Sequence, residues 1–168
     1  TGSGALAVAL SRSFPKWQGH AVDCSEEALV IAERNLKNLT FNSNYSLHLG
    51  SWWKPLEPWW GQFHLALANP PYIPTAEMKK LSPEIKGHEP HLALWGGADG
   101  LASCRSVISI AKKTLAPGGW LIIEHHHDQS GSVLKLMERF GLVEFSFETD
   151  LQGIKRFALG RNPLSKDD

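Results

Sequence analysis

The sequence has little cysteine, no excess of either charge and no long hydrophobic run. Its only two cysteines, Cys24 and Cys104, show neither metal-ligand nor redox spacing, which favours a reduced, cytoplasmic setting. No run approaches the roughly 18 apolar residues of a transmembrane helix, and no signal peptide is visible. The 17 basic residues balance the 17 acidic ones, and this zero net charge argues against a protein that grips a nucleic-acid backbone.

An initiator methionine is also absent, because the chain opens with Thr1-Gly2-Ser3-Gly4. No strand precedes these glycines, and apolar residues typical of a helix follow them directly. We interpret the opening as a fragment cut inside a motif. The length of 168 residues suits one domain. We assign residues 1–161 to this domain, incomplete at its N-terminus, and residues 162–168 to a loose polar tail.

Predicted strands and helices alternate along the chain. The helices are expected at residues 5–13, 25–39, 101–115 and 130–140. The strands are expected at residues 18–23, 45–49, 63–68, 120–124, 143–148 and 155–159. Residues 50–62 and 73–100 are interpreted as loops, the second with one helical turn at most. This alternation predicts an α/β fold with a parallel, doubly wound sheet, to which the last two strands add an antiparallel pair at one edge.

The most informative stretch is Asn69-Pro70-Pro71-Tyr72, which follows the apolar run 63–68. In open α/β sheets, ligands bind where the strands end. The Asn69 carboxamide offers an acceptor and a donor, the prolines lack an N–H, and Tyr72 adds a flat ring. Such a corner suits a planar group that carries an NH₂. The alternative is a plain strand-to-loop stop, for which Pro-Pro is common.

The glycines at the start of the chain and an acidic residue after them indicate a nucleoside-binding site. Residues 1–4 precede a helix, and glycine lets a backbone approach a ligand closely, although a plain turn of small residues fits equally. Asp23 lies 19 residues after Gly4, as expected for the acid that binds ribose hydroxyls; the alternative is a helix N-cap. Ala7 stands at the last position of G-x-G-x-x-G, where it is tolerated. NAD and S-adenosylmethionine therefore both stay open.

Aromatic residues and a second acid extend this set. Trp52 and Trp53 follow the strand 45–49, where one of them could flank an adenine ring or face a sulfonium; for Trp53 we favour packing. Glu89 precedes the glycine-rich loop 96–100, and it either orients the site or pairs with a surface base. His125, His126 and His127 are adjacent, and adjacent residues of an extended chain point to opposite faces. We therefore expect no metal site.

The sequence resembles the release-factor glutamine N5-methyltransferases (the HemK/PrmC family) from residue 1 to about residue 161. The stretch from Glu89-Pro90 to Gly100-Leu101 is the part most particular to this family, whereas Asn-Pro-Pro-Tyr is shared with many amino-methylating enzymes. The supporting segments are residues 1–4, 21–23, 34–36, 50–52, 69–73, 89–90, 92–94, 96–101, 118–119, 124–125, 150–153 with 156, and 160–161.

The resemblance implies a seven-stranded, Rossmann-like class I S-adenosylmethionine-dependent methyltransferase fold. It also implies transfer of a methyl group to the glutamine of the Gly-Gly-Gln motif in peptide chain release factors. The implied cofactor-binding residues are Thr1, Gly2, Ser3, Gly4, Asp23 at the ribose, Trp52 at the adenine, and Asn69. The implied substrate-binding residues are Asn69, Pro70, Pro71, Tyr72 and Glu89, of which Asn69, Pro70 and Tyr72 are the catalytic set.

Three departures from the family pattern stand out. Ser51 occupies the place of an acid just before the tryptophan, which puts recognition of the adenine amino group there in doubt. The first glycine of the glycine loop, with the strand that leads into it, is absent, so we expect a sheet without its central first strand. The N-terminal helical domain is absent too. Whether this segment folds or works alone is left open.

Two rival functions remain. An adenine-N6 nucleic-acid methyltransferase would use the same Asn-Pro-Pro-Tyr clamp, but it needs a basic channel and usually base flipping, which zero net charge disfavours. A non-catalytic nucleoside-binding remnant is the other. Our prediction is a cytoplasmic monomer that acts on release factors and contacts neither nucleic acid nor membrane.

Overall fold

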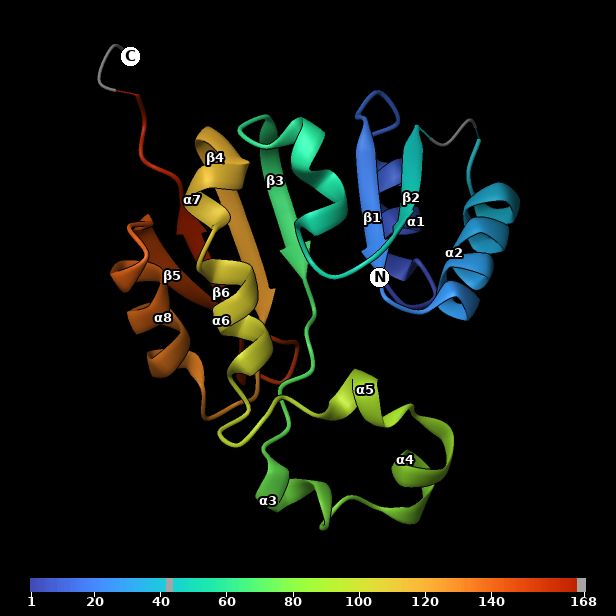
Figure 1. The fold of residues 1–168 in the computed structure, drawn as a ribbon, viewed down its shortest axis with the longest axis vertical. Helices are drawn as coiled ribbons and strands as arrows, with labels where there is room; N and C mark the ends of the chain where they lie inside the picture. The colour runs from blue at the N-terminus through green and yellow to red at the C-terminus, as the bar shows by residue number, and fades with distance from the viewer. Residues whose placement is uncertain (42–43, 166–168) are drawn as a thin grey trace. The chain divides into compact units, whose positions relative to one another are not determined.

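The computed structural model describes residues 1–41 and 44–165. The chain forms two compact units, Thr1–Pro58 and the part from Trp59 onward, and each is described by itself (Figure 1). Its strands fall into a two-stranded and a four-stranded sheet. No helix within the described ranges is long and apolar enough to cross a membrane.

The first unit packs two helices on a two-stranded parallel sheet. Strand β1 (Gly19–Asp23) pairs with β2 (Tyr45–Leu49), and helices α1 (Ala5–Ser13) and α2 (Glu26–Leu39) contact each other and the sheet. All four elements match the sequence predictions within a residue or two. The small core of this unit is formed by Ala7, Ala21 and Leu36, with Val8, Tyr45 and Leu47 packed against it.

The capping of α2 fixes the chain between β1 and this helix. The Ala28 N–H donates to the Ser25 hydroxyl at 3.1 Å, and two acids follow Ser25 in the first turn, where the helix dipole favours negative charge. Gly4 approaches α2 so closely that a Cβ at this position would lie 2.9 Å from the Ala32 Cβ. The glycine turn is therefore seated directly on the helix.

The second unit contains a mixed four-stranded sheet in the order β3-β4-β6-β5. Strands β3 and β4 are parallel, whereas β6 runs antiparallel to both β4 and β5. The predicted antiparallel pair at one edge is thus confirmed. The strands are β3 (Phe63–Ala68), β4 (Leu115–Glu124), β5 (Val143–Thr149) and β6 (Lys155–Arg161).

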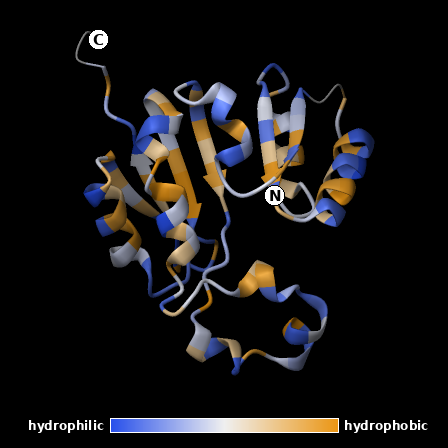
Figure 2. Cartoon of the chain, in the orientation of Figure 1, coloured by the Kyte–Doolittle hydropathy of each residue, from blue (hydrophilic) through white to orange (hydrophobic). Residues whose placement is uncertain are grey.

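Helices α7 (Ala111–Thr114) and α8 (Ser130–Arg139) pack on this sheet, and α6 (Ala102–Ile108) packs on both of these helices. Figure 2 shows hydrophobic residues concentrated in β3 and β4, while the helices alternate between hydrophobic and hydrophilic positions. Fully buried side chains fill the space between the layers; they include Ile108, Leu121, Ile123, Val133 and Met137.

The predicted helix at 101–115 is wrong in its extent, because the structure divides it into α6 and α7 and begins β4 at Leu115. The Ser106 hydroxyl donates to the Ala102 carbonyl at 3.1 Å, and the Ser109 hydroxyl donates to the Ser106 carbonyl at 3.2 Å. Side-chain bonds of this kind compete with the helical ladder and bend helices.

The two predicted loops also contain short helices. A 3₁₀ helix, η1 (Lys54–Trp59), lies in the first loop. Three short helices lie in the second, where at most one turn was expected: α3 (Thr75–Met78), α4 (Pro83–His88) and α5 (His91–Leu94). We call residues 75–94 the insertion; Figure 1 shows it beyond the end of β3.

The first residue of the predicted loose tail is held in place. Asn162 is buried, and its carboxamide donates to the carbonyls of Leu115 and Ala116 at 2.9 and 3.1 Å. These bonds tie the residue after β6 to the start of β4. Residues 166–168 of the predicted tail lie outside the described residues.

Candidate functional site

The Asn69–Tyr72 segment forms a corner directly after β3, as predicted. Asn69 is exposed at the strand end, whereas Pro70 is among the fully buried side chains and anchors the corner. The parallel register pairs Ala68 of β3 with Ile123 of β4. The next residue of each strand direction, Asn69 after β3 and Glu124 at the end of β4, therefore lies at the same edge of the sheet. This is the carboxyl edge, where ligands bind in α/β folds.

Tyr72 is held over this edge by Glu124. Its hydroxyl donates to the Glu124 Oε1 at 3.4 Å, and its ring lies 6.1 Å from the His126 ring. Burial, followed by the negative charge of Glu124, raises the pKa of Tyr72 above its ordinary value of 10.0. The phenol therefore keeps its proton at physiological pH and offers a neutral aromatic face.

The chain on both sides of the insertion is pinned at its base by backbone hydrogen bonds. The Ile73 N–H donates to the Leu94 carbonyl at 2.9 Å, and the Ile73 carbonyl accepts from the Gly96 N–H at 2.9 Å. The Trp95 indole N–H donates to the Thr75 hydroxyl at 2.8 Å. The two ends of the insertion are thus held together by hydrogen bonds, and these bonds also fix the chain directly after the corner.

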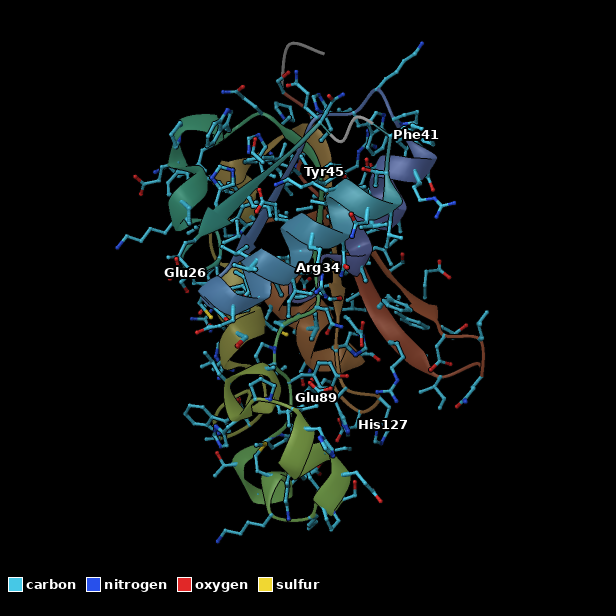
Figure 3. The ribbon with its side chains drawn as sticks, turned by 90° about the vertical axis from the view of Figure 1, so that its right-hand side faces the viewer. Glu26, Arg34, Phe41, Tyr45, Glu89 and His127 are labelled. Carbon is cyan, nitrogen blue, oxygen red and sulfur yellow. The ribbon has the colours of Figure 1, made fainter. Side chains whose placement is uncertain are left out.

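Glu89 follows α4 within the insertion and is exposed, where it is labelled in Figure 3. Within residues 1–41 and 44–165 its carboxylate forms no ion pair, so the interpretation as the partner of a surface base has no support there. It lies in a groove of about 520 Å³. The groove is lined by Met78, Lys79, Leu81, Lys86, Glu89, His91 and Leu94.

The second part of the predicted site lies in the first unit, around Asp23 at the end of β1. The Asp23 carboxylate accepts from the Gly2 N–H at 2.7 Å and from the Ser25 N–H at 2.9 Å. Burial alone would raise the pKa of Asp23, but the Thr1 ammonium and these two N–H groups hold it below its ordinary value. Of the three residues 23–25 that could cap α2, the N-cap is Ser25 and not Asp23.

The glycine turn leaves open space beside this carboxylate. Gly4 donates its N–H to the Thr1 carbonyl at 3.0 Å, which closes the turn. Gly2 has a φ of +56°, and no atom lies within 4 Å of the position that a Cβ would take. A ligand can therefore approach the backbone here, as the glycines of nucleoside-binding turns allow.

Trp52 follows β2 in an unusual backbone conformation. Its φ of 51° is positive, which is rare for a bulky residue, and strain of this kind clusters at ligand-binding sites. Trp53 is buried, as its interpretation as a packing residue requires. Gly50 donates to the Asp23 carbonyl at 2.8 Å and so ties the turn before Trp52 to the end of β1. A base-sized ring and a carboxylate thus lie at the carboxyl ends of two parallel strands, and the open turn at residues 1–4 lies beside the carboxylate.

Histidines gather after β4 in a way that the sequence did not suggest. The rings of His126 and His127 lie 4.1 Å apart, because the strand ends at Glu124 and the chain turns at residues 127–128. With Asp128, they bring three possible ligand atoms within 4.8 Å of one another. The His126 Nδ1 already contacts the Asp128 carboxylate at 2.7 Å. His125 is fully buried, away from solvent.

Two residues near the corner were missed from the sequence, Glu124 and Gln129. Glu124 had a usable signal, since it ends the strand that follows the corner in a parallel sheet. Gln129 had none, because its side chain reaches the Tyr72 carbonyl across 57 positions of sequence, at 3.0 Å.

Comparison with known proteins gives relatives along almost the whole chain, although no family model matches it. A Prochlorococcus marinus protein named release factor glutamine methyltransferase is 56% identical over 97% of this chain and 56% of its own length. A protein of the same name from Thermosynechococcus vestitus is 42% identical over 97% of this chain and 56% of its own length. The chain thus spans about half the length of these curated relatives.

A methyltransferase structure from Pyrococcus furiosus matches with a TM-score of 0.65 and 15% identity, and covers 98% of this chain and 72% of that one. The chain therefore has the class I fold of S-adenosylmethionine-dependent methyltransferases, as expected. Over nearly all of its residues it is similar in sequence to proteins named release factor glutamine methyltransferase, which bears out the resemblance seen in the sequence.

Proposed function

We propose that this chain takes part in methyl transfer from S-adenosylmethionine to the side-chain amide nitrogen of the glutamine in the Gly-Gly-Gln motif of peptide chain release factors. The observation that carries the proposal is the Asn69–Tyr72 corner at the carboxyl end of β3. The names of the relatives support the same substrate. We further infer a cytoplasmic monomer.

The residues of the first unit fit S-adenosylmethionine. The Asp23 carboxylate has acceptor capacity for ribose hydroxyls, the open space at Gly2 admits the ligand beside the Thr1–Gly4 turn, and Trp52 offers a ring for the adenine. When bound, this cofactor supplies an electrophilic methyl carbon on a sulfonium.

The corner would aim the nucleophile. An amide nitrogen reacts poorly, because its lone pair is delocalised into the carbonyl. The Asn69 Oδ1 and the Pro70 carbonyl would each accept one N–H of the substrate amide, which directs the lone pair outward and stabilises the positive charge that develops on nitrogen. In well-aligned model reactions, positioning is worth about 7–11 kcal/mol.

Tyr72 and Glu89 would hold the rest of the substrate. The neutral Tyr72 ring would stack on the amide plane, with Pro71 beside it in the same corner. No strong base is needed, since the nitrogen loses its proton readily once it is methylated. We assign Glu89 to substrate contact because this exposed acidic residue lines the groove of the insertion.

The test uses the protein as its gene encodes it, with S-adenosylmethionine labelled in its methyl group. We expect label on a release factor and none on duplex or single-stranded DNA offered in parallel. Transfer to DNA alone would favour the adenine methyltransferase. Cofactor binding without any transfer would favour the non-catalytic remnant.

Replacement of the key carboxamide gives a sharper test. Asn69→Ala should lower kcat by at least about 100-fold, the scale for loss of one positioned group in the transition state, and should leave the melting temperature unchanged, because Asn69 is exposed. Asn38→Ala, at an exposed position of α2, is the matched control. Retained methylation of the release factor by Asn69→Ala would refute the role.

A further inference from the structure

The side chain of Gln129 joins the Asn69–Tyr72 corner to the turn after β4. Its Nε2 donates to the Tyr72 carbonyl at 3.0 Å, and its Oε1 accepts from the His126 N–H at 3.0 Å. Gln129 is only 6% exposed. It occupies the N-cap position of α8, but its side chain makes no cap bond there. Its carboxamide therefore serves the corner and not the helix.

The orientation of this carboxamide is fixed by its two partners. The His126 N–H can only donate, and the Tyr72 carbonyl can only accept. Rotation of the amide by 180° would therefore place two acceptors together and two donors together, and would leave buried groups unsatisfied at a high cost.

The peptide group between Tyr72 and Ile73 is hydrogen-bonded at both of its polar atoms. Gln129 fixes the carbonyl of the Tyr72–Ile73 peptide, and the N–H of that peptide donates to the Leu94 carbonyl at 2.9 Å. On the other side of Tyr72, Pro70 and Pro71 have their φ angles fixed by their rings. The corner is thus constrained from both directions along the chain.

Two glycines make room for this arrangement. A Cβ at Gly100 would lie 2.4 Å from the Tyr72 carbonyl oxygen and 2.4 Å from the Gln129 Nε2. A Cβ at Gly96 would lie 2.8 Å from the Tyr72 Cα. Real Cβ atoms essentially never approach other atoms this closely. The glycine-rich loop 96–100 therefore packs directly against the hydrogen bond.

We propose that Gln129 is a positioning residue for methyl transfer. Seated against Gly96 and Gly100, it holds the backbone of the corner in the conformation that presents the Asn69 carboxamide and the Pro70 carbonyl to the substrate amide. This inference rests on the proposed function of the corner. It assigns a purpose to the glycines of the loop 96–100 that a plain turn would not require.

The variant Gln129→Glu tests the inference, because it replaces the side-chain NH₂ donor by an oxygen acceptor and keeps the size of the side chain. An ionised carboxyl here would face the Tyr72 carbonyl and repel it, whereas a protonated one would donate as the amide does. We expect kcat to fall at least about tenfold at pH 8, with the affinity for S-adenosylhomocysteine unchanged. Because burial raises the pKa of a carboxyl, the deficit should shrink as the pH falls toward 6. A deficit that is independent of pH, or no deficit, would overturn the inference.

A pair of glycine variants separates crowding from backbone strain. Gly100→Ala and Gly153→Ala place a side chain at similar positive φ angles, +75° and +80°, but no atom lies within 4 Å of the added Cβ at Gly153. We expect Gly100→Ala to lower kcat and Gly153→Ala to leave it near the wild-type value. Equal effects of the two would contradict the crowding at Tyr72.

Amide hydrogen exchange reports on the contact without any need for activity. In Gln129→Glu at pH 8, the Ile73 amide should exchange at least about tenfold faster, because its peptide loses the bond at the Tyr72 carbonyl, while amides of β1 and β2 stay unchanged. If the wild type transfers no methyl group but exchange rises as stated, the proposed function fails and the structural role of Gln129 stands. If the wild type methylates the release factor and the variant matches it in both exchange and kcat, the inference fails.

Discussion

At the scale of single residues, Asn69 and Asp23 both lie at strand ends but would have different roles. Asn69 is exposed and would act on the substrate, whereas Asp23 is part of a hydrogen-bonded turn with Gly2 and Ser25. Both could be chosen from the sequence, because an apolar run followed by a polar residue predicts the carboxyl end of a strand. Gln129 could not, since its importance depends on a contact between segments that are distant in sequence.

The role of Asp23 in binding is tested by Asp23→Ala. We expect S-adenosylhomocysteine to bind about 10- to 100-fold more weakly by calorimetry, since a hydrogen bond to a charged group is worth about 1.5–3 kcal/mol. Glu33→Ala, on the exposed face of α2, is the control. Unchanged affinity in Asp23→Ala would count against ribose recognition.

The two cysteines should differ in reactivity. Burial raises the pKa of the Cys104 thiol to about 12, whereas Cys24 is exposed. Because the thiolate is the reactive form, we expect one thiol per chain to react with a disulfide reagent in the folded protein and two after unfolding. Cys24→Ser should abolish the fast reaction. Rapid modification of Cys104 in the folded chain would contradict its burial.

At the scale of elements, regular patterns predicted the strands and the longer helices well. The exceptions were residues 101–115 and the insertion. In the first, serine side chains bond to helical carbonyls and interrupt the run. In the second, helices of four to six residues show too few turns for a hydrophobic period, and the segment is closed by backbone bonds at Ile73 that composition does not reveal.

The turn into α6 should show a pH-dependent ion pair. Arg105 donates two hydrogen bonds to the Asp99 carboxylate at 2.8 and 2.9 Å, and this contact, with the Leu101 N–H, lowers the pKa of Asp99 from 3.8 to about 2. The stabilisation is therefore present above pH 3.8 and lost as the pH falls through about 2. Since both side chains are exposed, it should amount to less than about 1 kcal/mol.

Urea unfolding between pH 7 and pH 2 checks this expectation. Asp99→Asn should be slightly less stable than the wild type at neutral pH, and the difference should vanish at the acid end. A double-mutant cycle with Arg105→Gln isolates the pair. If the difference in stability between the wild type and Asp99→Asn grows as the pH falls, the expected direction of the pH dependence is wrong.

At the scale of the molecule, the described strands fall into two sheets within two compact units, where the sequence led us to expect one domain over residues 1–161. The class of fold followed from the alternation of strands and helices, because each strand had a clear apolar run. Curated relatives are nearly twice as long as the matched segment.

The central claim is that a proline-braced corner holds a glutamine side chain by its amide hydrogens. A crystal structure of the protein as its gene encodes it, with S-adenosylhomocysteine and a peptide containing Gly-Gly-Gln, tests it most directly. The account predicts that the glutamine amide donates to the Asn69 Oδ1 and to the Pro70 carbonyl, with the ribose on Asp23. A glutamine side chain bound elsewhere, with Asn69 free of the peptide, would contradict it.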